Sequence, residues 1–317
     1  MATTERPIFV ESGMRVAKPK TPVRKFVDFL GANPLTRCVI RGISPFLIDT
    51  GTEAINFNLT SLDQLQEFWK PNALILIVAN HQSHADHLAM LTVTRKIRQG
   101  IPKLKTVFAP ISVTLENGIQ SGISQTIYHQ LALPTFEQNN ISPIYVVTPN
   151  DRAKRGIIQT REEAIAETEQ IKDAVKKDYS GMFVLAEGTV QPGRHKKDGS
   201  IYGMIKVVGP FFRVVIEAAR ESSRDVICIP VGVDKTHRIL SAEHIFLTRD
   251  SFMAIVRRFL RKKVMNLAEV TVGSPFIIGP QVNPRELNDS IMRDHIAPLI
   301  PMEARGVHKD NYESTSN

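Results

Sequence analysis

The sequence has few cysteines and no long apolar run, and each shortage excludes a class of protein. Its two cysteines, Cys38 and Cys228, lie far apart and form no Cys-x-x-Cys pair. We therefore expect two buried thiols rather than a disulfide framework or a structural zinc site. No stretch approaches the roughly 18 to 20 apolar residues that span a bilayer. Glu5 and Glu11 interrupt any secretory pattern, so we expect an intracellular protein without a transmembrane helix, soluble or peripherally attached.

Acidic residues are outnumbered, and the excess of positive charge restricts the partners. The chain has 40 Lys and Arg against 32 Asp and Glu, a net charge of +8. Such a charge suits nucleic acid, an anionic membrane surface or anionic substrates. The sequence has no RNP-type aromatic motif, zinc-finger spacing or basic block with interleaved aromatics, so we expect no nucleic-acid partner. A membrane surface and anionic substrates both remain open.

Residues 72–79 form the clearest predicted element, an uninterrupted apolar run that reads Asn-Ala-Leu-Ile-Leu-Ile-Val-Ala. A continuous run rather than an alternating one predicts a central strand buried on both faces. Helices are predicted at 87–98 and at 160–177, where Thr160 and Glu163 form a capping box. Strands alternating with helices predict an α/β fold with a mostly parallel central sheet and flanking helices. The further strands are expected at 106–109, 144–148, 182–186, 226–233 and 268–277.

The first 70 residues differ in character from the rest. Residues 1 to about 20 are polar and basic and read as a loose arm. Short amphipathic pieces follow up to about Trp69, and glycine and proline punctuate them, which predicts broken helices. We therefore divide the chain into a basic arm with an N-terminal helical extension, a main domain and a tail, at residues 1–70, 71–308 and 309–317.

The functional prediction depends on His81 and Asp86. In an open α/β sheet, reactive groups collect where strands end and helices begin, and His81 lies just after the strand predicted at 72–79. The pair can meet only if His81 lies in the strand-to-helix loop and Asp86 in the first helical turn, which the Ser-x-x-Asp pattern from Ser83 favours. Asp86 would then accept a hydrogen bond from one imidazole nitrogen and leave the other as a base. Such a dyad suits direct attack by a substrate hydroxyl.

Residues 80–86 carry a resemblance to a known family. They read Asn-His-Gln-Ser-His-Ala-Asp, and Asn-His-x-Ser-x-x-Asp after an apolar strand resembles the first motif of the glycerol-phosphate acyltransferases, which include 1-acylglycerol-3-phosphate acyltransferase. Residues 183–189, Phe-Val-Leu-Ala-Glu-Gly-Thr, resemble the family's strand ending in Pro-Glu-Gly-Thr-Arg. Residues 229–231 resemble its later apolar strand with a proline, and residues 291–306 its closing helix and tail. The resemblance runs from about residue 70 to 308, in order.

The resemblance implies roles for the matching residues and shows two departures. His81 would deprotonate an acceptor hydroxyl and Asp86 would orient His81. An arginine usually follows Glu-Gly-Thr in the family, but Val190 stands there, so Arg194 or Lys196 is expected to supply the charge for a phosphate. The second family motif, Gly-x-x-Phe-Ile-x-Arg, has no match from Val107 to Leu133, where the region of Gly118 and Gly122 comes nearest but lacks the arginine. The implied substrate-binding residues are Asn80, Ser83, Glu187, Gly188, Thr189, Arg194 and Lys196.

The resemblance therefore implies an acyltransferase of lipid metabolism, with residues 71–308 as its catalytic domain and a glycerol-3-phosphate acyltransferase-like fold. The enzyme would move a fatty acyl group from acyl-CoA or acyl-carrier protein to a hydroxyl of a glycerol-phosphate or lysophospholipid-like acceptor. The resemblance implies no metal and no cofactor beyond the acyl thioester. It also implies a cytoplasmic protein in peripheral contact with an anionic membrane, at its inner face.

Two alternative interpretations remain open. His84, Asp86 and His87 match the tail of His-x-His-x-Asp-His, the two-metal motif of the metallo-β-lactamase fold, although Gln82 stands where its first histidine belongs. A metal-dependent hydrolase would use that cluster. The other alternative is a non-catalytic lipid-binding protein, which would use the basic segment at residues 251–263. That segment predicts either a core-packed helix with a solvated basic face or a helix on anionic lipid.

Overall fold

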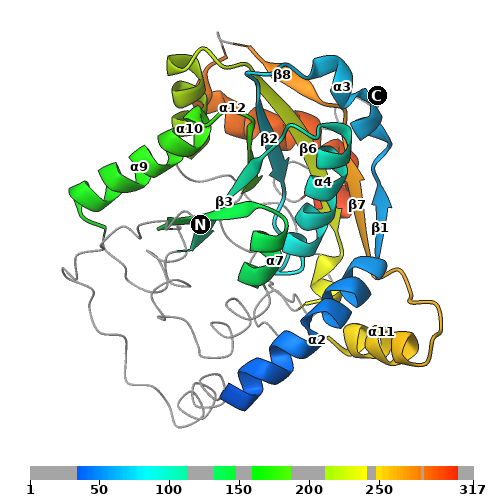
Figure 1. The fold of residues 1–317 in the computed structure, drawn as a ribbon. Coiled ribbons are helices and arrows are strands. Elements are labelled where there is room, and N and C mark those ends of the chain that lie inside the picture. The colour runs from blue at the N-terminus through cyan, green and yellow to red at the C-terminus, as the bar shows by residue number, and fades with distance from the viewer. Residues whose placement is uncertain are drawn as a thin grey trace, which may run out of the picture.

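The centre of the molecule is an eight-stranded sheet (Figure 1). Its strand order is β1-β7-β6-β2-β5-β3-β4, and β8 pairs with β6. The structure is a computed structural model that describes residues 34–112, 132–147, 159–186, 211–240, 248–279 and 282–305. The strands are β1 (Ile55–Asn58), β2 (Leu74–Ala79), β3 (Thr106–Ser112), β4 (Ile141–Val146), β5 (Ser180–Leu185), β6 (Val226–Asp234), β7 (Ala268–Val272) and β8 (Phe276–Ile278).

The helices alternate with the strands along most of the chain. In α9 the predicted capping box is present, because Glu163 N donates to Thr160 Oγ1 at 3.2 Å and Thr160 N donates to Glu163 Oε2 at 2.7 Å. The α-helices are α2 (Pro34–Glu53), α3 (Leu65–Phe68), α4 (Asp86–Gly100), α7 (Leu133–Gln138), α9 (Arg161–Lys176), α10 (Phe211–Glu221), α11 (Arg249–Phe259) and α12 (Pro284–Ser290). Short helical segments are η1 (Thr60–Gln64), η3 (Thr236–Arg238), η4 (Ile291–Ile296), η5 (Ala297–Leu299) and η6 (Met302–Ala304).

The strand directions confirm the predicted fold class, an α/β fold with a mostly parallel sheet. The neighbouring strands β6, β2, β5, β3 and β4 all run parallel. Among the described strands, β7 and β8 are antiparallel to β6, and β1 is parallel to β7. The single strand predicted at 268–277 was wrong, because β7 and β8 are separate. Pro275 lies between them and has no N–H for a sheet ladder, and Gly273 N donates to Pro230 O at 2.9 Å.

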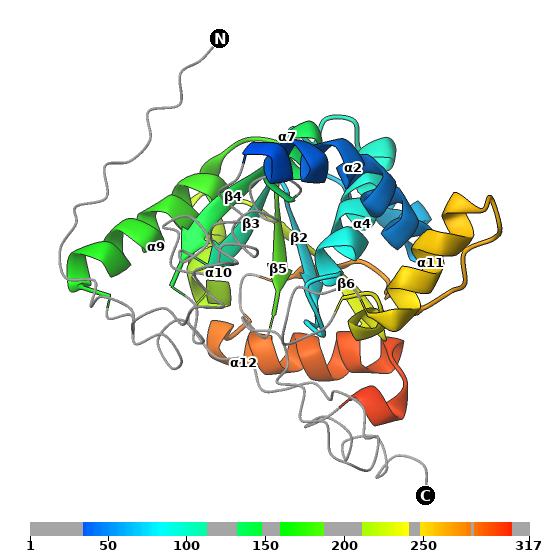
Figure 2. The same ribbon diagram turned by 90° about the horizontal axis from the view of Figure 1, so that it is seen from below.

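The continuous apolar run of β2 is buried on both faces, as predicted. Leu74, Leu76 and Val78 pack into the core formed with α9, α10 and α12. Ile75 and Ile77 pack into the opposite core with α4 and α7. Figure 2 shows the same arrangement, with α2, α4 and α7 on one side of the sheet and α12 on the other. The sheet therefore separates two apolar layers, and α4 is fixed on one of them.

The N-terminal region differs from the broken helices expected there. Residues 34–53 form one helix, α2, that continues through Pro45. A proline removes one helical hydrogen bond, but packing on α4 supports the helix: a Cβ on Gly51 would lie 2.7 Å from Leu88 Cδ1. The next element, β1, pairs with β7 in the main sheet. The expected boundary at residue 70 therefore does not separate β1 from the central sheet.

The two cysteines have different environments. Both are free thiols, and Cys228 is buried in β6 as expected. Burial raises the pKa of the Cys228 thiol well above its ordinary value. Cys38 is exposed on α2, so the expectation that both thiols are buried was wrong for this residue. Within the described ranges, no helix is both long enough and apolar enough to cross a membrane.

Candidate active site

The candidate site lies at the carboxyl end of β2, in the loop that leads into α4. His81 is in this loop and Asp86 is the first residue of α4, as predicted. Asn80 fixes the start of the loop to β6: its Nδ2 donates to Val233 O and its Oδ1 accepts from Val233 N, both at 2.8 Å. The loop is therefore held at the sheet edge by two strands, β2 and β6.

The Asp86 carboxylate is the centre of the hydrogen-bond network. It is fully buried, and its Oδ2 accepts from Gln82 N at 2.6 Å and Ser83 N at 3.0 Å. The same oxygen lies 2.8 Å from His81 Nδ1. Its Oδ1 accepts from the Thr236 hydroxyl. A buried carboxylate without partners would be costly, so these four donors stabilise Asp86 in one orientation.

This carboxylate fixes the orientation of the His81 ring. A carboxylate only accepts hydrogen bonds, so in the neutral imidazole the proton lies on Nδ1 and the lone pair on Nε2. The side chain of His81 is 9% exposed, which restricts its motion and its contact with water. A histidine held in this tautomer can remove a proton from a hydroxyl presented to Nε2.

His87 lies beside His81 and Asp86, and its environment lowers its pKa. Its ring centroid is 6.1 Å from that of His81 and 6.1 Å from that of Phe136, and it lies 6.4 Å from that of Phe183. Burial, followed by the proximity of His81, lowers the pKa of His87 from 6.5 to about 4. His87 Nδ1 lies 3.2 Å from His84 O, to which it donates. His87 is therefore neutral near pH 7 and packs as an aromatic neighbour.

The arrangement gives no support to the metal-dependent alternative. Both oxygens of Asp86 already accept hydrogen bonds from the chain, and His87 directs Nδ1 at the His84 carbonyl. Among the described residues, no group of three or more His, Cys, Asp or Glu side chains is placed to hold a metal ion. The cluster predicted from His84, Asp86 and His87 therefore does not form a ligand set here.

Two predicted substrate-binding residues, Asn80 and Ser83, have backbone partners. The Asn80 amide is paired with β6, and Ser83 Oγ accepts from Ala85 N at 3.1 Å. Both side chains are fully buried. Their observed bonds shape the loop, and contact with substrate stays a prediction. The other predicted binding residues lie outside the described ranges: Glu187, Gly188, Thr189, Arg194 and Lys196.

Gln82 was not predicted as a site residue, yet its side chain is unusual. Gln82 lies between His81 and Asp86 in the sequence, and its side chain is fully buried. Its Nε2 and Oε1 have no hydrogen-bond partner in the part of the chain that is described. An unpaired buried amide costs about 1 to 3 kcal/mol.

Thr236 is the residue of the network that sequence reasoning missed. It lies in η3, directly after β6, and is 150 residues from Asp86 in the chain. Lys235 adopts a left-handed backbone conformation with φ of 60° at this turn. The register pairs Ala79 with Val231, so parallel strands β2 and β6 end at the same edge. Because the carboxyl ends of neighbouring parallel strands meet at one edge of the sheet, the residues after β6 could have been predicted as neighbours of His81.

The end of β5 also lies beside the candidate site. Ala79 pairs with Leu185, and Ala186 N donates to Ala79 O at 2.8 Å.

Comparison with models of known protein families finds no match for this chain, and comparison with curated proteins finds none either. The function is therefore inferred from the geometry of the site and from the order of its motifs.

Proposed function

We propose that the chain is an acyltransferase of the glycerol-phosphate type, with His81 as general base and Asp86 as its orienting partner. The observation that carries the proposal is the 2.8 Å contact between His81 Nδ1 and Asp86 Oδ2. Three further donors hold the same carboxylate, so the imidazole is oriented by a fixed group. This is the arrangement that general-base attack by a substrate hydroxyl requires.

The proposed reaction transfers an acyl group in one attack. His81 Nε2 takes the proton of the acceptor hydroxyl while the hydroxyl oxygen attacks the carbonyl carbon of a thioester. The new C–O ester bond forms, the C–S bond breaks, and the departing thiolate takes the proton back from His81. The chain supplies no covalent nucleophile in this scheme. Asp86 stabilises the imidazolium that exists between the two proton transfers.

The positions of the motifs support the finer assignment to a glycerol-3-phosphate acyltransferase-like fold. β2 leads into the first motif, and its two neighbours in the sheet are β5 and β6. β5 contains residues 183–185 of the second segment that resembles the family, and β6 contains residues 229–231 of the third. The second and third of these segments therefore lie on β5 and β6, the two parallel neighbours of β2, and the first segment follows β2 directly.

The proposed donor is acyl-CoA or acyl-carrier protein, and the proposed acceptor is a glycerol-phosphate or lysophospholipid-like alcohol. No metal or further cofactor takes part in the proposed reaction. Arg194 and Lys196, with the segment at 187–189, stay the predicted contacts for the acceptor. The positive net charge of +8 is compatible with such anionic substrates.

The test is transfer from labelled acyl-CoA to a panel of acceptors: glycerol-3-phosphate, lysophosphatidic acid and unphosphorylated lysolipids. The His81→Ala variant should lose about 10²- to 10⁴-fold in turnover, the usual contribution of a general base. The matched variant His84→Ala should keep most of the activity, because His84 has no place in the proposed reaction. Absence of transfer to every acceptor by folded protein, or equal loss in both variants, would contradict the proposal.

A further inference from the structure

α11 is an amphipathic helix with three exposed large apolar side chains, Phe252, Met253 and Phe259, while Ile255 and Val256 are half-buried. It buries the small residues Ser251 and Ala254, which are 4% and 3% exposed. Phe252 and Phe259 are 59% and 80% exposed, and Leu260 directly after the helix is 57% exposed. A helix that packs on a soluble core normally buries its large apolar residues. The exposed Phe252 and Phe259 therefore favour the lipid-surface interpretation of residues 251–263, which stays a prediction.

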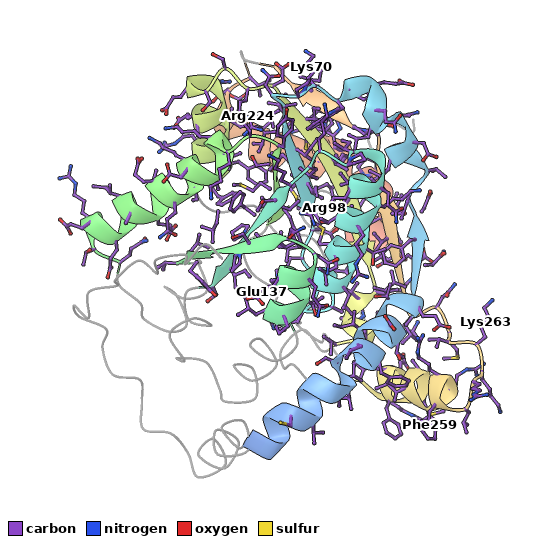
Figure 3. The ribbon with its side chains drawn as sticks, viewed as in Figure 1. Lys70, Arg98, Glu137, Arg224, Phe259 and Lys263 are labelled. Atoms are coloured by element: carbon purple, nitrogen blue, oxygen red, sulfur yellow. The ribbon has the colours of Figure 1, made fainter. Side chains whose placement is uncertain are left out.

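This orientation is fixed by contacts between α11 and α2, which lie side by side (Figures 1 and 2). Arg258 forms an ion pair with Glu53, and its Nη2 lies 3.7 Å from Asp49 Oδ2. The guanidinium also lies over the Phe46 ring, 5.7 Å from its centroid. Arg258 thus fastens the inner side of α11. Figure 3 shows Phe259 at the end of the helix, directed away from the sheet.

The same region carries most of the net charge of the chain. Residues 249–263 contain six basic residues and one acidic residue, a net charge of +5 against +8 for the whole chain. The acidic residue, Asp250, accepts from Arg238 Nε and Nη2 at 3.0 and 2.8 Å. Arg261, Lys262 and Lys263 are exposed directly beside Leu260. Aromatic and aliphatic side chains are therefore bordered by three cations that have no acidic partner among the described residues.

We propose that this outer face of α11, defined as Phe252, Met253, Phe259, Leu260 and the basic residues 261–263, docks on the surface of an anionic lipid bilayer. Buried apolar area and attraction to anionic headgroups are the two contributions that hold such a helix in the interface plane. A second copy of the chain would bring two +5 segments together, which like-charge repulsion opposes. No residue of this face takes part in the hydrogen bonds around Asp86, so the inference goes beyond acyl transfer and does not require it.

The experiment is flotation of the full chain with vesicles of phosphatidylcholine mixed with phosphatidylglycerol, and with vesicles of phosphatidylcholine alone. The wild type should bind the anionic vesicles, and added salt should weaken binding because it screens the charges. The double variant Phe259→Ser/Leu260→Ser should bind at least about tenfold more weakly. Lys262→Gln/Lys263→Gln should weaken binding by about fivefold for each charge removed.

Matched controls lie on other surfaces of the chain. Ile165 is 54% exposed on α9, and Lys103 is an exposed lysine after α4, so Ile165→Ser and Lys103→Gln should bind vesicles like the wild type. The proposal would be overturned if the wild-type protein did not bind anionic vesicles, or if the Phe259→Ser/Leu260→Ser variant bound them as well as the wild type. A dimer that this variant dissociates, with vesicle binding intact, would assign the face to a second copy instead. His81→Ala should bind vesicles normally, so failure of catalysis and failure of docking are distinguishable.

Discussion

α4 and α11 are both amphipathic helices with basic residues, but they place their large side chains in opposite directions. α4 buries Met90, Val93 and Ile97 against the sheet. α11 buries only Ser251 and Ala254 and exposes its aromatic residues. The two helices therefore show that an apolar stripe in a sequence indicates a face to be covered, without indicating that the chain itself covers it.

The difference matters for what each helix can do. α4 begins at Asp86 and is anchored by a buried face, so the carboxylate that orients His81 is attached to a rigid element. α11 contacts the rest of the described chain through small side chains and through the ion pairs of Asp250 and Arg258. A rigid element suits catalysis, which depends on positions held to a fraction of an ångström, whereas an outward apolar face suits association with a partner.

The largest expected effect on stability comes from comparing the same substitution on both helices. Met90 is fully buried on α4, and Met253 is 45% exposed on α11. Met90→Ala should lower the free energy of unfolding by about 2 to 5 kcal/mol, because it removes buried apolar atoms and leaves a cavity. Met253→Ala should change it by less than about 0.5 kcal/mol. Urea unfolding measures both; equal losses would remove the contrast between the two helices.

A change of pH is expected to have a smaller effect on the free energy of unfolding, and its source is His87 on α4. The pKa of His87 is about 4 in the folded protein and about 6.5 when unfolded, so the unfolded state binds more protons between these values. Stability is therefore full above pH 6.5 and falls as the pH falls towards 4, by up to about 3 kcal/mol. His87→Leu should flatten this dependence in unfolding measured at a series of pH values. An unchanged slope in the variant would show that other groups cause it.

The smallest effects are expected from substituting two threonines, Thr236 at the candidate site and Thr248 at the start of α11. Thr236 donates to Asp86, and Thr248 caps α11 by accepting from Ser251 N at 3.1 Å. Thr236→Val should lower acyl-transfer turnover by about tenfold, because a hydrogen bond to a charged group is lost, and Thr236→Ser should restore it. Thr248→Val should cost about 1 kcal/mol of stability and leave turnover unchanged. A Thr236→Val variant with full turnover would show that this hydroxyl does not help to position Asp86.

The parts of the fold that follow from local sequence were predictable. The apolar run of β2 specifies a strand buried on both faces, and the Thr160 and Glu163 pair specifies the start of α9. The loop between β2 and α4 was predictable as well, because Ser83 and Asp86 are three residues apart and their pairing is local. These features need no information from distant parts of the chain.

The features that were missed depend on tertiary contacts. β1 has only four residues and is a strand because β7 lies beside it. α2 continues through Pro45 because α4 packs on its far end. The hydroxyl of Thr236 reaches Asp86 only through the pairing of β6 with β2. In each case a long-range neighbour outweighs local propensity.

The Thr236 contact also has a consequence for folding. His81 and Asp86 are five residues apart and can approach each other early, but the fourth donor to the carboxylate comes from a residue 150 positions later. Closing so long a loop has an entropic cost that only the assembled β-sheet offsets. The complete hydrogen-bond network therefore exists only once β6 has joined β2, so recovery of the proposed acyl transfer on refolding would report sheet assembly rather than helix formation.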